Sequence, residues 1–139
     1  MGKLNLAVDP QHSLPLYMQI VWQVRRLLAL GALRPGDRCP PVRQIAASAG
    51  VNRNTAARAV AEMRGQGLVR TRPGMGTFFA DRAPFVPAVQ RESALDSAIE
   101  ALLIEAHTLG VAPEEIGICL SRKLEYFARA RRERDGQST

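Results

Sequence analysis

Apolar residues recur at helical spacing over the first part of the chain. Pro15 suits the first position of a helix, and Gly31 suits the position that ends one. The apolar positions between them are Leu16, Tyr17, Ile20, Val21, Val24, Leu27 and Leu28. This periodicity predicts an amphipathic helix, followed by a turn at the Pro-Gly pair of RPGD (34–37).

A second helix is predicted directly after this turn. It follows Pro40 and Pro41 and ends at Gly50. Its apolar positions on one face are Val42, Ile45, Ala46 and Ala49. A third helix runs from an Asn52 cap to about Gly65.

Two short runs after the third helix have the composition of strands. They are LVRTR (68–72) and GTFFA (76–80), and Pro73, Gly74 and Gly76 between them favour a tight hairpin turn. LNLAV (4–8) is a further short strand by composition. The order helix, helix, helix, hairpin is that of a winged helix. We therefore expect a mainly α fold with a small β-hairpin wing over residues 1–80.

The rest of the chain predicts two amphipathic helices. A proline-marked linker at 81–92 precedes them, and they occupy 93–134, before a disordered tail at 135–139. The first stripe, which ends at Gly110, contains Leu95, Ala98, Ile99, Leu102, Leu103, Ala106 and Leu109. The second, after Pro113, contains Ile116, Leu120, Leu124 and Phe127.

These two stripes require a further surface, because two such helices cannot bury both apolar faces against each other alone. We expect a second copy of the same region to cover them, which makes it a two-helix dimerisation region and the protein a homodimer. The alternative is a monomer in which the tail folds back on its own winged helix.

Composition adds the cellular setting. The chain is 46% hydrophobic, but it has no apolar run long enough for a membrane span, and MGKLNLAVDP lacks the apolar stretch of a signal peptide. Cys39 and Cys119 have no CxxC partner and suit a reducing compartment. We expect a cytoplasmic protein with no membrane partner.

Charge divides the chain at the same linker. Up to Arg82 there are 12 Lys and Arg against 4 Asp and Glu, whereas from Ala83 onward there are 7 against 9. The basic part indicates a polyanionic partner, although a basic surface that serves only solubility is the alternative.

The second and third helices have the spacing of a helix-turn-helix. Ala46 and Gly50 supply the small contact residue and the glycine turn that this motif requires. Any two packed helices joined by a glycine turn would look similar. The unusual feature is the polar start of the third helix, where Asn52 caps and Arg53, Asn54 and Thr55 follow.

Double-stranded DNA explains those side chains. In a helix-turn-helix the first turn of the second helix meets base edges in the major groove, where arginine binds guanine and asparagine binds adenine. Arg58, about one turn beyond Asn54, can reach a phosphate or a base on the same side. Backbone N–H groups at either helix start can also bind phosphate.

The segment from Leu14 to Ala80 resembles the winged-helix domain of the GntR family of bacterial transcriptional regulators. The resemblance is carried by PLYMQI, GALRPGDRCP, PPVRQIA, AGVNRNT and GLVRTRPGMGTF. VNRNTAARA (51–59) and the short tail resemble the YtrA-like subfamily, whose C-terminal region has two helices.

The resemblance implies specific contacts. Arg43 in the second helix contacts DNA, the first turn of the third helix and Arg58 lie in or beside the groove, and Gly74 lies at the wing tip near the minor groove. Arg70 and Arg72 flank the wing and can touch phosphate, or they are strand-face charges. Arg43 can equally lie in solvent. Pro41 and Ala57 depart from the family pattern, which often has serine and arginine there, so a family operator sequence does not transfer.

Other chemistry finds little support. No phosphate-cradling loop, nucleophile–histidine pair or paired carboxylates appear, so we expect no enzyme, no cofactor and no metal site; His12 and His107 are isolated. Cys39 is a buried structural thiol or, alternatively, an oxidant sensor. An unidentified small-molecule effector has room only at a dimer interface.

We therefore expect a homodimeric transcriptional regulator, a repressor by type, that binds an inverted-repeat operator. The subfamily resemblance implies control of transporter genes and of its own operon. The alternative is a winged helix for protein–protein contacts or a nonspecific nucleic-acid-binding module.

Overall fold

The computed structural model describes residues 4–80 and 86–137. Its elements are α1 (Leu16–Ala29), α2 (Val42–Ala49), α3 (Arg53–Gly65), β1 (Val69–Arg72), β2 (Gly76–Phe79), α4 (Ala88–Thr108) and α5 (Pro113–Gly136). The chain divides into two compact units, Met1–Pro84 and Phe85–Thr139. The mainly α fold with one hairpin is as predicted.

Glycines in the left-handed conformation end the helices of the first unit. Gly31 follows α1 with a φ of 72°, and Gly50 ends α2 with a φ of 68°. Because Gly50 turns the chain so sharply, only Val51 and Asn52 separate it from α3, and the Val51 N–H bonds back to the carbonyl of Ala46 at 3.0 Å. This confirms the predicted glycine turn between the two helices.

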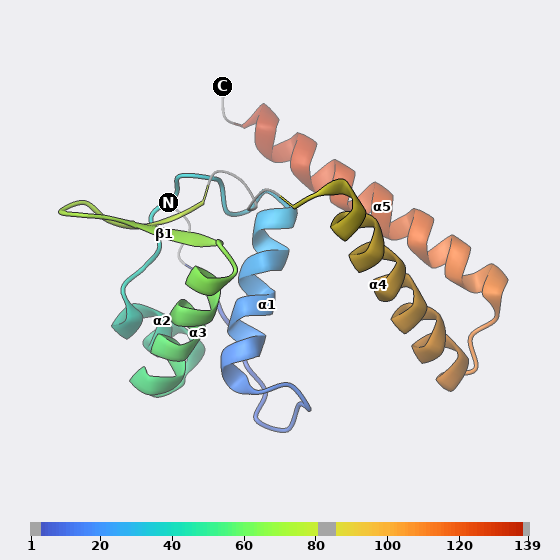
Figure 1. Ribbon diagram of the computed structural model, residues 1–139, viewed down its shortest axis with the longest axis horizontal. Coiled ribbons are helices and arrows are strands. Elements are labelled where there is room, and N and C mark those ends of the chain that lie inside the picture. Colours follow the sequence, from blue (N-terminus) through green and yellow to red (C-terminus); the bar gives the residue numbers. More distant parts are fainter. Residues whose placement is uncertain (1–3, 81–85, 138–139) are drawn as a thin grey trace. The chain divides into compact units, whose positions relative to one another are not determined.

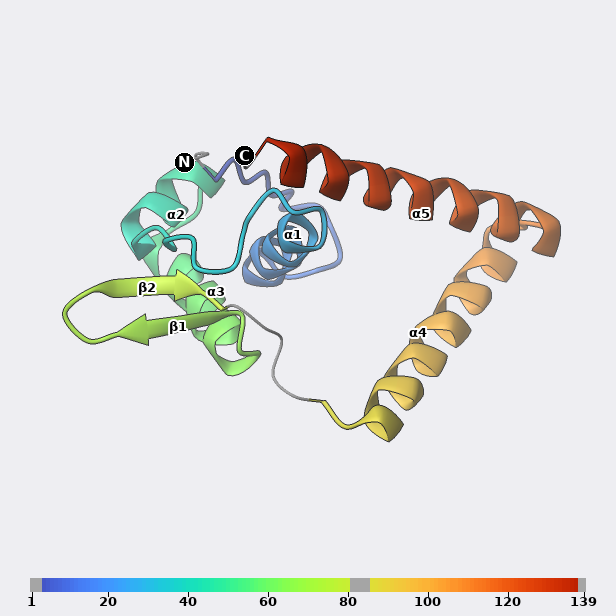
Figure 2. The ribbon, with the colours of Figure 1, turned by 90° about the horizontal axis from the view of Figure 1, so that it is seen from above.

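One apolar core joins the three helices to the hairpin. Phe79, Ile20, Ile45, Met63, Val21, Val24 and Val69 are its largest fully buried side chains. They come from α1, α2, α3 and both strands, so the apolar stripes predicted from the sequence meet in one place. The hairpin extends away from the helices as a wing (Figures 1 and 2).

The hairpin has an inner and an outer face. Val69 pairs with Phe79 and Thr71 with Thr77 on the inner face, whereas Arg70 pairs with Phe78 on the outer face. The segment before α2 runs beside β2 and bonds to its backbone. The Phe79 N–H donates to the Asp37 carbonyl and the Cys39 N–H donates to the Thr77 carbonyl, both at 2.8 Å. β2 is therefore hydrogen-bonded on one edge to β1 and on the other to the segment before α2.

The predicted strand at LNLAV (4–8) is wrong, since this segment pairs with no strand. Leu4 and Leu6 are nevertheless buried in the core. Side chains satisfy the backbone instead of a neighbouring strand. Leu6 N–H donates to Ser48 at 3.3 Å, and Ala7 N–H donates to Gln23 at 3.0 Å. The apolar composition of this segment thus goes with burial but not with a sheet.

The second unit is a pair of helices joined at Gly110, whose φ is 71°. The helices diverge from this turn (Figure 2). Most of their apolar side chains are exposed, and only Ala106 is buried among the described residues of this unit. The exposed members of the predicted stripes are Leu95, Ala98, Ile99, Leu102, Leu103, Leu109, Leu120 and Leu124, while Ile116 and Phe127 are half-buried.

Two boundaries differ from the prediction. α4 begins at Ala88, inside the predicted linker 81–92, because AVQRE after Pro87 contains no helix breaker. α5 continues to Gly136, into the predicted disordered tail 135–139, since charged residues are good helix formers. Residues 81–85 and 138–139 of these two segments lie outside the described residues.

Candidate nucleic-acid interface

The first turn of α3 presents polar side chains to solvent. Arg53 and Asn54 are exposed and Thr55 is half-buried. The opposite face of the helix is buried through Ala56, Ala59, Val60 and Met63. The apolar stripe thus anchors the helix, and the residues expected to meet base edges project outward.

Asn52 is used to start the helix. Its side-chain oxygen accepts a hydrogen bond from the Thr55 N–H at 2.8 Å, which satisfies one of the free donors of the first turn. The predicted cap is confirmed. Asn52 is exposed, and its expected place at the DNA surface stays a prediction.

Arg58 is held against α1. Its guanidinium carbon lies 4.0 Å from the centroid of the Tyr17 ring, and Nη2 lies 3.5 Å from the Tyr17 hydroxyl. Tyr17 is half-buried in the first turn of α1, while Arg58 is exposed. A cation over an aromatic face is attractive, so the Arg58 side chain has a preferred direction.

Arg43 is exposed in the first turn of α2. No side chain caps this helix, because its N-cap is Pro41. The Gln44 N–H donates to the Pro41 carbonyl at 2.9 Å, whereas the N–H groups of Val42 and Arg43 have neither an intrahelical acceptor nor a capping side chain and favour an anion.

The outer face of the wing is basic. Arg70 and Arg72 are both exposed on it, and the Arg72 guanidinium carbon lies 5.1 Å from the centroid of Phe78. At the tip, Gly74 has a φ of 73°, a conformation that favours glycine. Met75 beside it is 58% exposed, so the tip offers one apolar side chain close to the basic strand β1.

Arg38 reaches along this face from the segment before α2. Its Nη2 donates to the carbonyl oxygen of Met75 at 2.6 Å, and its guanidinium carbon lies 5.9 Å from the Phe78 centroid. A side chain on Gly76 would meet Arg38 at 3.0 Å, and Gly76 has a φ of 116°. Arg38 therefore fixes the tip, and only glycine fits beneath it.

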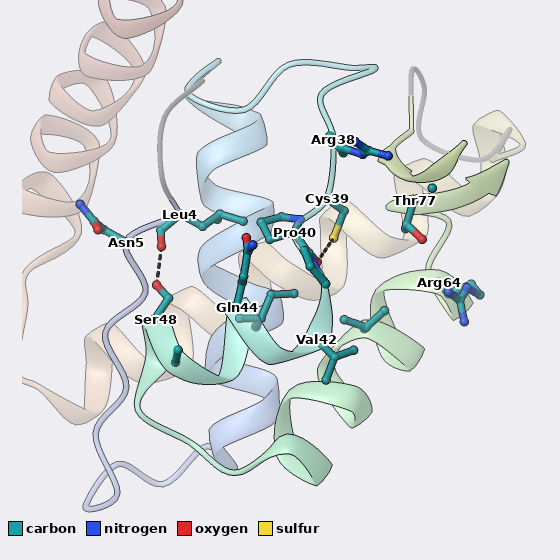
Figure 3. A pocket seen from close by; sticks show the side chains of 15 residues that line it. Leu4, Asn5, Arg38, Cys39, Pro40, Val42, Gln44, Ser48, Arg64 and Thr77 are labelled. Atoms are coloured by element: carbon teal, nitrogen blue, oxygen red, sulfur yellow. Dashed lines mark hydrogen bonds between the residues drawn. The ribbon is translucent and has the colours of Figure 1, made fainter. Parts of the chain in front are cut away.

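An open groove separates the start of α2 from the inner face of the wing (Figure 3). Arg64 and Thr77 line one side of it, and Arg64 Nη2 donates to Thr71 at 3.2 Å. Cys39 lies at its base and is buried. Burial raises the pKa of this thiol to about 11, although the nearby Arg64 charge opposes the shift. The expected buried thiol is thus present.

The chain is similar to proteins of a known class. Residues 16–79 match the bacterial regulatory proteins of the gntR family. The chain is 32% identical over 111 residues to the HTH-type transcriptional repressor YtrA of Bacillus subtilis (strain 168), an alignment that covers 80% of this chain and 85% of that protein. The chain belongs to the gntR family of bacterial regulatory proteins. It is a DNA-binding transcriptional regulator and not an enzyme, and its YtrA-like resemblance is confirmed.

Further relatives agree with this family. The chain is 37% identical over 106 residues to the HTH-type transcriptional regulator YhcF of Bacillus subtilis (strain 168), covering 76% of this chain and 87% of YhcF. A transcriptional antiterminator from Listeria monocytogenes EGD-e has a similar structure, with a TM-score of 0.75 and 25% identity over 91% of this chain and 94% of that one. These likenesses confirm the winged-helix fold.

Sequence reasoning missed two residues of this GntR-family surface. Tyr17 was assigned only to the apolar stripe of the first helix, and Arg38 was not singled out. Both contact residues roughly 40 positions away, so periodicity could not connect them. The only local signals for these two residues were that Tyr17 lies in the first turn of a predicted helix and that Arg38 lies shortly before another.

Two classes of feature are absent from the described part of this GntR regulator. No group of three or more His, Cys, Asp or Glu side chains within residues 4–80 and 86–137 could hold a metal ion. No helix within the same ranges has the length and apolar content needed to cross a membrane.

Proposed function

We propose that this regulator binds an inverted-repeat DNA operator as a homodimer and represses transcription from it. The observation that carries the proposal is the start of α3, where Arg53 and Asn54 are exposed while the opposite face of the helix is buried. Arginine and asparagine are the side chains that read guanine and adenine bidentately in the major groove.

The wing and α2 support contacts on either side of the groove. Arg43, Arg70 and Arg72 are exposed, and phosphate contacts of this kind set the register of a protein on DNA without reading sequence. Gly74 at the wing tip faces the minor groove in this proposal. Half-sites then lie about one helical turn, roughly 10 bp, or a multiple of it apart.

Exposed apolar side chains on α4 and α5 support the homodimer. Leu102 and Leu124 are 47% and 62% exposed, and the other large apolar residues of the two predicted stripes that are similarly exposed are Leu95, Ile99, Leu103, Leu109 and Leu120. Contiguous exposed apolar surface on a soluble protein usually marks an interaction site. A second copy covers both stripes at once and matches the two-fold symmetry of an inverted repeat.

The chain is similar to the YtrA repressor, so repression is proposed here by similarity. The subfamily resemblance further favours transporter genes, together with the regulator's own operon, as targets. In this proposal the bound dimer represses transcription by blocking the promoter sterically.

The first test is selection of bound sequences from a random DNA pool, with the mass of the protein measured in solution. We expect a palindromic motif and a dimer mass. Binding without an enriched motif, seen only at low salt, would leave the alternative of a nonspecific nucleic-acid-binding module. A motif bound by a monomer would overturn the homodimer alone.

Arg53→Ala then tests the assignment of α3. The substitution should weaken binding to the selected operator by about 1–3 kcal/mol and relax the preference at one base position. Arg25→Ala is the matched control. It also removes one exposed arginine, but from α1 and not from the first turn of α3. If Arg53→Ala binds as tightly as the parent, α3 does not read bases through this residue.

A further inference from the structure

The contact between Tyr17 and Arg58 joins two helices at the edge of the proposed base-reading surface. Tyr17 lies in the first turn of α1 and Arg58 in the second turn of α3. Both helices start at the same end of their unit (Figure 1). The ring and the guanidinium are 4.0 Å apart, so the pair forms one continuous polar edge across two helices.

Stacking determines what Arg58 can bind. The guanidinium carbon lies 4.0 Å from the ring centroid, so Tyr17 covers one side of the group, and the N–H donors that do not face Tyr17 point away from it. One of them approaches the Tyr17 hydroxyl at 3.5 Å. Within residues 4–80 and 86–137, Arg58 has no acidic partner and no other hydrogen bond. Several donors of a full positive charge thus remain open to solvent.

The direction of the side chain separates Arg58 from the base-reading residues. Arg58 is four positions beyond Asn54, so the two lie on the same face of α3. Asn54 is at the helix start, where side chains enter the groove, whereas Arg58 is turned toward α1 by Tyr17. A group held at the rim of the groove meets the sugar–phosphate backbone before it meets base edges.

We infer that Tyr17 and Arg58 together bind one backbone phosphate of the operator. The edge of the guanidinium donates to one phosphate oxygen, and the Tyr17 hydroxyl donates to another or to the same one. α1 thereby takes part in DNA binding, and Arg58 fixes the register of α3 without reading sequence. This inference rests on the proposed operator binding and names one of its contacts.

Salt dependence and sequence selection distinguish a phosphate contact from a base contact. The full-length protein and its selected operator are titrated by fluorescence anisotropy over a series of NaCl concentrations. We expect Arg58→Gln to select the parent motif and to reduce the slope of log K against log salt by about 1. We expect Tyr17→Phe, which keeps the ring, to weaken binding by about 2-fold to 10-fold with an unchanged slope, because the lost donor is uncharged.

A neutral phosphate locates the contact. Methylphosphonate is substituted at each backbone position of the operator in turn. At one position the substitution should weaken operator binding by the parent protein but have little effect on operator binding by Arg58→Gln. Arg25→Gln, which removes an exposed charge from α1, should respond at that position as the parent does. Thermal unfolding of each variant checks that it is folded.

Two results would overturn the inference. A changed base preference for Arg58→Gln would make Arg58 a base-reading residue. Unchanged affinity and slope for folded Arg58→Gln and Tyr17→Phe would leave the pair as a packing contact between α1 and α3. Failure of the parent protein to select any motif would instead count against the proposed function.

Discussion

The guanidinium of Arg38 donates to the main-chain carbonyl of Met75 at 2.6 Å, across 37 positions of sequence. It joins the segment before α2 to the tip of the wing. The same guanidinium approaches Phe78, which Arg72 also approaches from the next strand. The tip is therefore positioned by a residue that belongs to neither strand of the hairpin.

Arg38→Ala should loosen the wing tip. Loss of one exposed charge-assisted hydrogen bond corresponds to about 1 kcal/mol, or roughly 5-fold faster exchange of the tip amides. Hydrogen–deuterium exchange of the amides of residues 74–77 measures this effect. Arg70→Ala removes the same charge from the same face of the sheet, but Arg70 does not reach Met75, so it should leave exchange unchanged. Equal amide exchange in the two variants would show that the hydrogen bond from Arg38 does not stabilise the tip.

Asn52→Ala should destabilise the winged-helix unit by about 1 kcal/mol, because the Thr55 N–H loses its acceptor. Urea unfolding followed by circular dichroism measures the difference. Asn52→Ser keeps a capping oxygen and serves as the control, which should retain most of the stability. An alanine variant as stable as the serine variant would mean that solvent replaces the cap at no cost.

Cys39 should make stability depend on alkaline pH. Its pKa is raised from 9.0 to about 11 by burial, so folding favours the protonated thiol. The contribution is complete below pH 9, where the unfolded thiol is also protonated, and it is lost as pH rises through about 11. Between pH 8 and pH 10 the parent should lose about 1 kcal/mol more than Cys39→Ala. Parallel losses in the two proteins would contradict the shift.

Thiol labelling gives a second measure of the same burial. Cys119 is exposed on α5 and should react with a disulfide reagent at pH 8, whereas Cys39 should react only when the protein unfolds. Cys119→Ser leaves Cys39 as the sole thiol and makes the slow reaction visible alone. Rapid labelling of that variant without denaturant would contradict the burial of Cys39 and show that the folded protein exposes this thiol.

Leu102→Glu should shift the proposed dimer toward monomer, because a charge on the apolar stripe of α4 would be buried at the interface. Ile104→Glu is the matched control. Ile104 is similarly exposed, at 61%, but lies on the opposite side of the helix from Leu95 and Ile99. Analytical ultracentrifugation reports both masses. Dissociation by Ile104→Glu alone would assign the interface to the other face.

Local sequence signals predicted most of the winged-helix unit. Gly31 and Gly50 ended helices where expected because their left-handed φ is a local property. Asn52 capped α3 for the same reason, through a bond only three residues long. The hairpin followed from its turn glycines and strand composition.

Contacts between distant segments were not predictable in this way. The side chains of Ser48 and Gln23 bond to the backbone of Leu4, Leu6 and Ala7, so side chains replaced the strand expected at 4–8. Arg38 and Tyr17 acquired their partners in the same manner. Composition cannot show which polar side chain a fold uses to satisfy a distant backbone.

The outer face of the wing carries Arg38, Arg70 and Arg72, and none of them forms an ion pair within residues 4–80 and 86–137. The guanidinium carbons of Arg38 and Arg72 lie 5.9 Å and 5.1 Å from the same Phe78 ring, so their like charges repel one another in the unbound protein, and dissolved ions screen that repulsion. The same ions compete with the protein for DNA. Rising ionic strength should thus raise the melting temperature of the free protein while it releases the operator, so folding and recognition respond to salt in opposite directions.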